Sequence, residues 1–257
     1  MKKIALTSLL TIAMASAAHA SVNVMDGNPL YMPRAGHFYS ETALGSHSEH
    51  GEDWALGEEF GYGVTNQLAL KVKTSVSEID SFDGYAWNDT SFGLTMRLLK
   101  KNGWVADIYG GYGVAPVWGD HRPFLDEDDT KYTWTAGLRA GYMTARWTVA
   151  GYFDFNYIGE ESFNWDDEGR HVLHAGVAGQ YLIDRDWNLV ADVVYTGVTD
   201  NGVKNAGTWE GKFGINYNID STKYVGAYIS GGLEHETTGD WEWADGVGYG
   251  VKFGVDF

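Results

Sequence analysis

The chain has 257 residues, with 11 Trp, 16 Tyr, 11 Phe and 34 Gly, but only four Pro and no Cys. This composition favours aromatic-rich strands over a helical bundle, and it leaves no disulfides or thiolate metal sites to stabilise the fold. A formal net charge of −17 argues against nucleic acid as a partner, because such proteins need a basic surface.

Residues 1–20 have the pattern of a cleavable export signal. Lys2 and Lys3 precede an apolar run at residues 4–14, and residues 18–20 read Ala-His-Ala, a small-x-small cleavage site. The apolar run is shorter than the roughly 20 residues needed to span a bilayer, and no later stretch reaches that length. We therefore predict an exported chain without a helical anchor, and loss of the two lysines takes its net charge from −17 to −19.

From Gly36 onward the chain repeats one unit, in which two alternating stretches flank a short turn and a longer polar segment follows. Leu68, Leu70 and Val72, for example, alternate with more polar or smaller residues, and a period of two indicates β-strand. Short and long connections alternate, as in transmembrane barrels with tight periplasmic turns and longer external loops. The predicted strands are residues 36–45, 53–64, 68–77, 89–99, 104–115, 132–143, 147–158, 170–182, 187–197, 206–217, 223–233 and 244–257.

Aromatic residues recur at fixed positions relative to the turns. Trp104, Trp147 and Trp187 each open a strand after a short turn, which puts three indoles at one height. Together with tyrosines that precede short turns, they predict one interfacial girdle, and a second aromatic set predicts the other. The tyrosines of the first girdle are Tyr62, Tyr142, Tyr181 and Tyr217, and the second girdle comprises Trp54, Tyr112, Trp134, Tyr157, Tyr195 and Trp209.

The last predicted strand alternates apolar residues with small or charged ones and closes on Phe257, the final residue. In this feature the chain resembles bacterial outer-membrane β-barrel proteins, and no narrower subfamily is indicated. The resemblance implies an all-β, antiparallel, up-and-down transmembrane β-barrel of about 12 strands in the Gram-negative outer membrane. It also implies that the barrel-assembly machinery reads the strand ending in Phe257, and that outer-membrane lipid and lipopolysaccharide surround the wall.

The predicted domain organisation has three parts. Residues 1–20 are the signal peptide, residues 21–35 a periplasmic N-terminal lead-in, and residues 36–257 the transmembrane barrel. The lead-in does not alternate in polarity and holds two of the four prolines. A short plug that enters the lumen is the alternative for this segment.

Turning the apolar face outward assigns six acidic and six basic residues to the interior. An Arg or Lys facing lipid costs about 2–4 kcal/mol at the midplane, so a watery or paired lumen is where these charges should lie. The predicted pore-lining residues are Glu41, Glu59, Lys71, Lys73, Arg97, Asp107, Arg139, Asp154, Asp192, Glu210, Lys212 and Lys252. Inward tyrosines could stack a passing sugar or nucleoside, or simply fill a small barrel; these are Tyr39, Tyr109, Tyr152, Tyr224 and Tyr228.

Turn positions fix the register of neighbouring strands and so predict particular ion pairs. The pairs are Glu59 with Lys73, Arg97 with Asp107 and, diagonally, Arg139 with Asp154. They either brace the wall or form a charge ladder along a permeation path. Glu58 is an exception, because alternation points it toward lipid; a bulge or a position at the outer lip would explain it.

The longer connections carry 23 acidic residues against four basic ones, so almost all of the net charge is external. An acidic rim attracts cations over about 8–10 Å at physiological salt, and it could share divalent cations with anionic lipid. Residues 126–129, Asp-Glu-Asp-Asp, lack the spacing of an EF-hand loop, and we expect neither a metal site nor a cofactor.

No catalytic constellation is recognisable. His174 and Thr196 are predicted to face each other, but a nucleophile and base need an orienting third group, and Asp192 is offset from them. We expect a narrow porin or channel for small solutes with an acidic, mildly cation-favouring external mouth. The alternatives are a non-conducting surface barrel that acts through its acidic loops as an adhesin or scaffold, and, third, an outer-membrane hydrolase.

Overall fold

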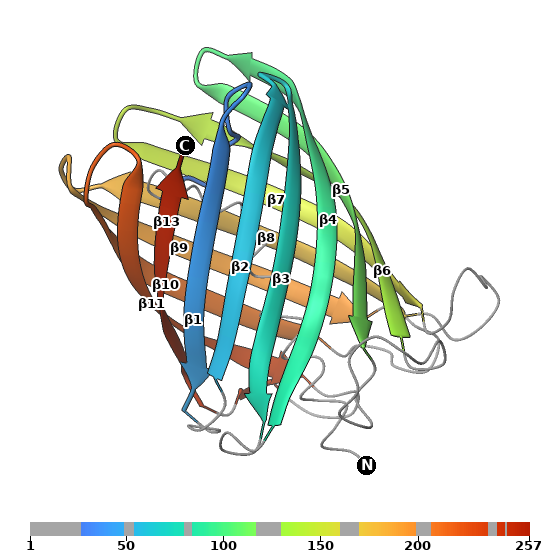
Figure 1. The fold of residues 1–257 in the computed structure, drawn as a ribbon. Coiled ribbons are helices and arrows are strands. Elements are labelled where there is room, and N and C mark those ends of the chain that lie inside the picture. The colour runs from blue at the N-terminus through green and yellow to red at the C-terminus, as the bar shows by residue number, and fades with distance from the viewer. Residues whose placement is uncertain are drawn as a thin grey trace.

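A computed structural model of the chain describes residues 27–48, 54–79, 84–116, 130–159, 170–198, 207–235, 241–244 and 246–257. The strands form one antiparallel sheet that closes on itself as a barrel (Figure 1). Within these ranges no helix has the length and apolar character to cross a membrane. The predicted signal peptide and most of the acidic loop residues lie outside the described residues.

The strands follow one another around the wall in chain order. They are β1 (Phe38–His47), β2 (Trp54–Thr65), β3 (Leu68–Ile79), β4 (Gly84–Lys101), β5 (Trp104–Pro116), β6 (Thr130–Met143), β7 (Trp147–Gly159), β8 (Arg170–Leu182), β9 (Trp187–Val198), β10 (Gly207–Asn218), β11 (Lys223–His235), β12 (Trp241–Trp243) and β13 (Gly248–Asp256). β13 pairs with both β11 and β1 and so closes the barrel. The short strand β12 pairs only with the last residues of β11. The wall therefore has 12 strands, which confirms the predicted fold class.

Of the strand starts, that of β4 departs furthest from its prediction, and a register shift lies in the same region. β4 begins at Gly84, five residues before the predicted start at 89, and pairs with the end of β3. A bulge between Thr74 and Val76 changes the phase of alternation, so Trp87 and Thr90 lie opposite residues of the same face. A prediction based on strict alternation ends the strand at such a shift, because the residues beyond it no longer alternate in phase with the rest.

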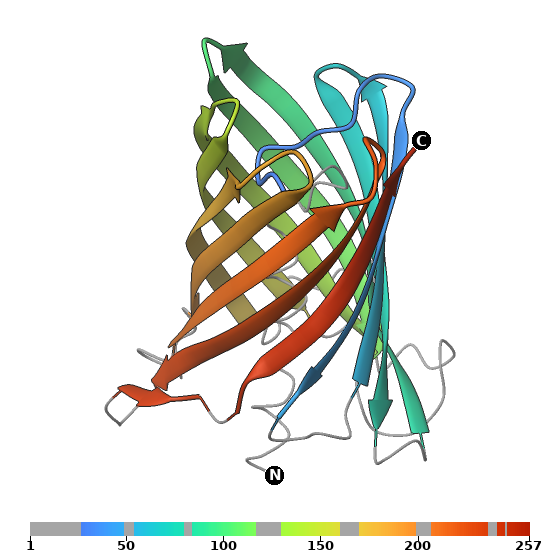
Figure 2. The same ribbon diagram turned by 90° about the vertical axis from the view of Figure 1, so that its left-hand side faces the viewer.

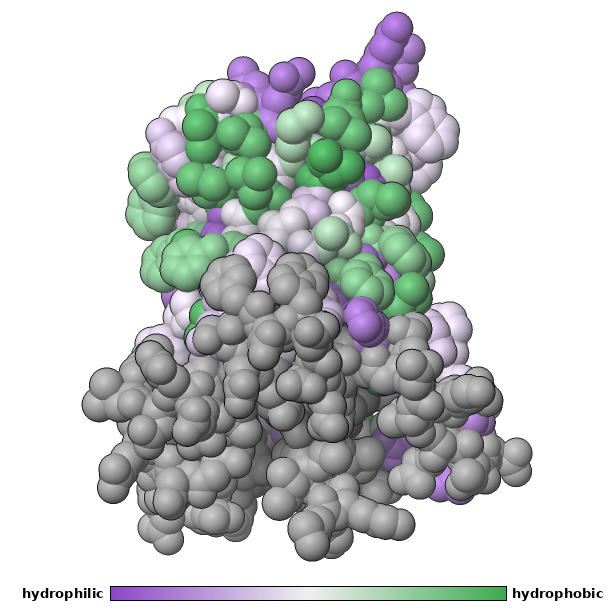
Figure 3. Space-filling model, turned by 90° about the vertical axis from the view of Figure 1, so that its right-hand side faces the viewer, coloured by the Kyte–Doolittle hydropathy of each residue, from purple (hydrophilic) through white to green (hydrophobic). Residues whose placement is uncertain are grey.

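The outer surface is an apolar belt between two aromatic girdles. Apolar side chains cover much of the described surface in Figure 3. At the short-turn end Tyr142 lies between Trp104 and Trp147, with ring centroids 5.1 and 5.6 Å apart. At the loop end Tyr112 and Trp134 lie 4.7 Å apart. Both predicted girdles are thus present as packed aromatic clusters.

Residues 27–33 lie inside the barrel at the short-turn end, and the exposed residues 34–37 connect them to β1. In Figure 2 the blue trace of this segment leaves the top of β1 and runs across the barrel. Leu30 is 1% exposed and packs against the inward side chains of Val105 and Ala150. The described part of the predicted lead-in therefore has the geometry of the alternative, a short plug, rather than that of a segment outside the lumen. An alternation pattern cannot reveal this, because irregular chain is placed only by its tertiary contacts.

Candidate functional site

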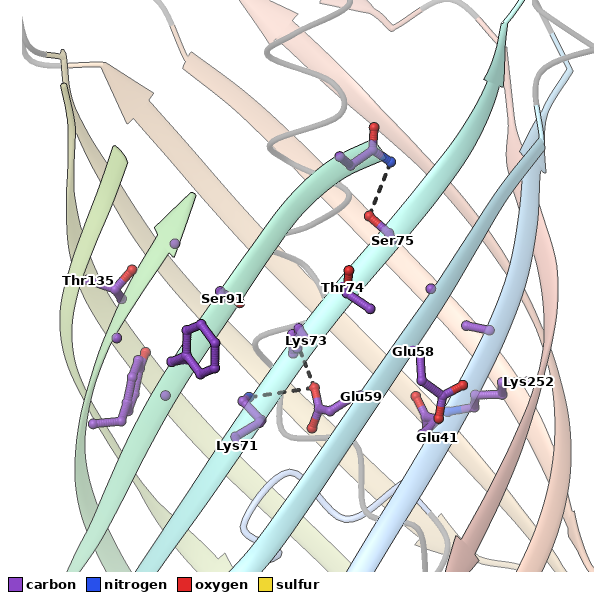
Figure 4. A pocket seen from close by; sticks show the side chains of 18 of the residues that line it. Glu41, Glu58, Glu59, Lys71, Lys73, Thr74, Ser75, Ser91, Thr135 and Lys252 are labelled. Carbon is purple, nitrogen blue, oxygen red and sulfur yellow. Dashed lines mark hydrogen bonds and ion pairs between the residues drawn. The ribbon is translucent and has the colours of Figure 1, made fainter. Parts of the chain in front are cut away.

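The bore holds a cavity of about 260 Å³ whose lining combines acidic, basic and aromatic side chains. Glu41, Glu59, Lys71 and Lys73 come from β1 to β3, and Lys252 from β13 lies beside them (Figure 4). Because alternate residues of each strand point inward, charges from several strands meet in this one space. The predicted placement of charge inside the barrel accounts for the ionisable side chains in this lining.

Glu59 is the centre of one charged cluster in the cavity. Its carboxylate lies 2.9 Å from Lys73 Nζ and 3.6 Å from Lys71 Nζ, and it accepts a hydrogen bond of 2.5 Å from the Tyr39 hydroxyl. Glu59 is 7% exposed, so these partners replace most of its water. The Glu59–Lys73 pair predicted from the turn register is confirmed.

Glu41 forms a second cluster where the barrel closes. It accepts a hydrogen bond from the Tyr224 hydroxyl, and Lys252 Nζ lies 5.4 Å from the centroid of the Tyr224 ring. Lys212 lies over the Tyr228 ring at 3.7 Å. Acidic, basic and aromatic groups are therefore interleaved along this wall, which leaves its charge nearly balanced.

Asp107 binds two guanidinium groups in the short-turn half of the bore. Arg97 donates Nε and Nη2 to its two oxygens at 2.8 and 3.0 Å, and Arg139 donates Nε at 2.8 Å. The predicted Arg97–Asp107 pair is confirmed. The predicted diagonal partner of Arg139, Asp154, is wrong: Arg139 pairs with Asp107, which lies directly opposite it on β5.

The same two arginines hold the segment that crosses the bore. Arg97 donates Nη2 to the carbonyl of Leu30 at 2.6 Å. Arg139 donates to the carbonyls of Pro29 at 3.1 Å and Tyr31 at 2.9 Å. Buried carbonyls of irregular chain need donors, and a guanidinium supplies five of them in a fixed plane.

The segment reaches opposite walls of the barrel. A Cβ built on Gly27 would lie 2.5 Å from Val190 Cγ1 of β9, whereas Ala35 forms an isolated bridge with Gly63 of β2. Between these ends, Tyr31, Met32 and Pro33 line the short-turn side of the cavity. The described segment therefore obstructs the bore at this end.

A third cluster surrounds Asp154 on β7. His174 Nδ1 lies 2.6 Å from Asp154 Oδ1, which also accepts from Asn156 at 2.7 Å, and the Tyr109 hydroxyl donates to Oδ2 at 2.9 Å. His174 faces Thr196 across β8 and β9, as predicted. Asp154 is the orienting carboxylate that the sequence pattern did not supply, but Asp154 and His174 are only 1% and 2% exposed. None of these groups except Tyr109 lines the cavity.

Four of the five predicted inward tyrosines share an arrangement that the sequence did not predict. Each ring lies over a glycine of the adjacent strand, and each hydroxyl donates to an inward carboxylate. A glycine lacks the Cβ that would collide with the ring, so ring and backbone can touch. The sets are Tyr39 with Gly61 and Glu59, Tyr109 with Gly137 and Asp154, Tyr152 with Gly176 and Asp192, and Tyr224 with Gly254 and Glu41.

Seven of the twelve predicted pore-lining residues contribute to the cavity. They are Glu41, Glu59, Lys71, Lys73, Arg139, Lys212 and Lys252. The remaining five lie beside or behind this lining as partners of its charges and tyrosines, and they are Arg97, Asp107, Asp154, Asp192 and Glu210. A role of any of them in permeation stays a prediction.

The chain end lies at the seam of the barrel. Phe257 and Phe38 exchange backbone hydrogen bonds of 2.8 and 3.3 Å, and the Phe257 side chain is 69% exposed. Its predicted part in recognition by the assembly machinery stays a prediction.

Comparison with known proteins identifies the fold. No family model matches the chain, and no curated protein matches its sequence. Among solved structures, the NanC porin has a TM-score of 0.59 at 10% identity, covering 84% of this chain and 98% of that one. The KdgM porin has a TM-score of 0.57 at 9% identity, covering 85% and 99%. An outer-membrane channel from Pseudomonas putida F1 has a TM-score of 0.53 at 15% identity, covering 88% and 97%.

These likenesses define a class. The chain has the fold of the bacterial outer-membrane β-barrel proteins, and the neighbours named above are porins and channels within that class. No narrower family is identified.

Proposed function

We propose that this protein is a narrow outer-membrane channel for small solutes, with an acidic external mouth that mildly favours cations. The observation that carries the proposal is the cavity of about 260 Å³ in the bore, lined by charged and hydroxyl-bearing side chains. A structural barrel with no solute to pass has no need to hold ionised groups around an interior space, because burying charge is costly. The named neighbours, which are porins and channels, add support at the level of the fold.

The cation preference follows from where the charge lies. The inner wall carries six acids and six bases, and Lys212, for example, interacts with both Glu210 and Asp192. Such a wall discriminates weakly by sign, whereas the sequence of the longer connections, most of which lies outside the described residues, carries 23 acids against four bases. A cation is therefore attracted electrostatically as it enters. The attraction acts over the screening length of about 8–10 Å at physiological salt.

The second candidate is a non-conducting surface barrel that acts through its acidic loops. One observation favours it: residues 27–33 cross the bore and are held there by the Arg97–Asp107–Arg139 cluster. In the channel proposal this segment narrows the path or moves aside. An outer-membrane hydrolase is a weaker candidate, because the Asp154–His174 pair is sealed from the cavity.

Liposome swelling tests the proposal. Purified protein in vesicles should admit small solutes such as glycine or a monosaccharide, and it should exclude trisaccharides because residues 27–33 narrow the bore. Vesicles with heat-denatured protein are the control. Swelling rates equal to the control for every solute would favour the non-conducting barrel.

A further inference from the structure

The Glu58 side chain faces outward in the middle of the apolar belt, although its strand also borders the cavity (Figure 4): it shares its face of β2 with Leu56 and Phe60, which are 50% and 52% exposed. Its register is unbroken on both sides, directly opposite Thr42 on β1 and Thr74 on β3, so no bulge turns it inward. It lies four residues from Trp54 and four from Tyr62, the girdle residues of β2, which places it about 13 Å from either. Glu58 is therefore at neither lip of the barrel, and both explanations expected from the sequence fail.

A row of hydroxyls accompanies this carboxylate. Ser40 and Thr42 donate to its two oxygens at 2.6 and 2.5 Å. On the other side Thr74 and Thr90 share a hydrogen bond of 3.0 Å, and Trp87 donates Nε1 to Thr90 at 2.9 Å. We name the set Ser40, Thr42, Glu58, Thr74 and Thr90 the polar patch; it spans β1 to β4.

The polar patch is confined to one side of the barrel. Between the girdles, the outward positions of β5 to β11 and β13 in the described ranges carry only aliphatic, aromatic, methionine or glycine residues. On the far wall Val177 and Val193 are 56% and 48% exposed. A carboxylate on a lipid-facing surface is expensive, and the apolar residues elsewhere show what that surface otherwise requires.

The patch is complementary to itself. Glu58 accepts one bond on each oxygen and has lone pairs to accept more. Thr74 and Thr90 have two hydroxyl protons between them, of which their mutual bond uses one. The acceptor Glu58 and the donors Thr74 and Thr90 thus lie on the same face of neighbouring strands. In a symmetric dimer, the acceptor of each copy can then contact a donor of the other copy.

We propose that the polar patch is the contact surface of a symmetric homodimer, in which Glu58 of each barrel accepts from a threonine hydroxyl of the other. The two-fold axis runs along the membrane normal beside β3, which lies between the acceptor on β2 and Thr90 on β4. Packing of two patches removes the Glu58 carboxylates from lipid. It also pairs the remaining lone pairs of each carboxylate with the remaining threonine hydroxyl proton of the other copy. The proposal is independent of whether the barrel conducts.

Single cysteines test this geometry, because the chain has none of its own. Val72→Cys and Val76→Cys place thiols on β3 beside the patch without altering it. Oxidation in native membranes should link two copies through at least one of these sites, since a disulfide needs Cα atoms within about 7 Å. Val177→Cys, the matched control on the opposite wall, should stay monomeric.

Glu58→Leu in the Val72→Cys and Val76→Cys backgrounds then tests the role of the carboxylate. It should lower the disulfide yield about tenfold, because each copy loses a charged acceptor. Leucine suits a lipid-facing position, so the variant should still fold, which heat-modifiable migration on a gel would verify. Equal linkage through Val177→Cys, no linkage at either β3 site, linkage to a different protein, or a yield unchanged by Glu58→Leu would overturn the proposal.

Discussion

At the scale of single residues, the interior is organised by tyrosines that rest on glycines and donate to carboxylates. Tyr109 is one example: its ring lies over Gly137 and its hydroxyl meets Asp154 at 2.9 Å. The ring fills space, and the hydroxyl supplies a hydrogen bond that the buried acid needs. A glycine on β6 therefore lets a tyrosine on β5 reach across to a carboxylate on β7.

Adding a methyl group at Gly137 should disrupt this arrangement. The new Cβ would lie 2.5 Å from the Tyr109 ring and 2.6 Å from Asp154 Cβ, and overpacking of this kind costs about 1–3 kcal/mol. We expect Gly137→Ala to lower the free energy of unfolding in urea by that amount. Gly231→Ala, whose Cβ meets nothing within 4 Å, is the control and should change it little. Equal stability of both variants would contradict the packing described for Tyr109.

Asp107 offers a second test at this scale. Asp107→Ala leaves the buried guanidinium groups of Arg97 and Arg139 without a counter-ion, and breaking a buried ion pair in this way costs about 3–5 kcal/mol. The free energy of unfolding should fall accordingly. Asp186→Ala, which removes an exposed carboxylate 3.7 Å from Arg185, should have a far smaller effect. A loss for Asp107→Ala no larger than that control would show that the cluster is not stabilising.

The predictable ion pairs are those joined by short turns. Glu59–Lys73 and Arg97–Asp107 each span one tight turn, whose position fixes the register of both strands. Asp107–Arg139 and Asp154–His174 join strands separated by long connections, residues 117–129 and 160–169, which impose no register. Sequence reasoning therefore found the first two pairs and missed the others.

At the scale of elements, the twelve strands follow from their period of two, whereas the segment of residues 27–37 does not. Irregular chain carries no periodicity, and its position depends on donors contributed by β4 and β6. The bulge near Thr74 was missed for a related reason, because it breaks the period itself. Regular structure was thus predictable, while its exceptions were not.

Replacing residues 28–35 with a Gly-Ser linker of equal length should raise conductance, if the barrel conducts as proposed. The linker lacks the side chain of Leu30, which packs against Val105 and Ala150, and that of Tyr31. The segment should then leave the bore more often. Tyr31→Phe removes the hydroxyl that donates to Asp256 at 3.3 Å but keeps the ring and the rest of the segment, and it should conduct like the parent. Unchanged single-channel conductance in the linker variant would mean that the segment does not limit flow.

At the scale of the whole molecule, the proposed channel has a balanced interior and takes its selectivity from the acidic residues that the sequence places in the longer connections. Six acids face six bases inside, and the loops hold most of the remaining acids. Alternation assigns each strand residue to a face, so the inward charges were predictable, whereas the external position of the loop acids stays a prediction. The proposed preference for cations should therefore depend on the salt concentration. Salt screens charges at a solvated mouth, and paired charges in the bore contribute little to the preference.

The most direct test of the proposed function is the current through the purified, folded protein in a planar bilayer under a salt gradient. The proposed channel should give discrete current steps, with a reversal potential that indicates mild cation preference at low salt and approaches zero preference near 1 M, where the screening length is about 3 Å. The absence of steps in both the parent and the variant with the linker at residues 28–35, or a reversal potential that favours anions, would contradict it.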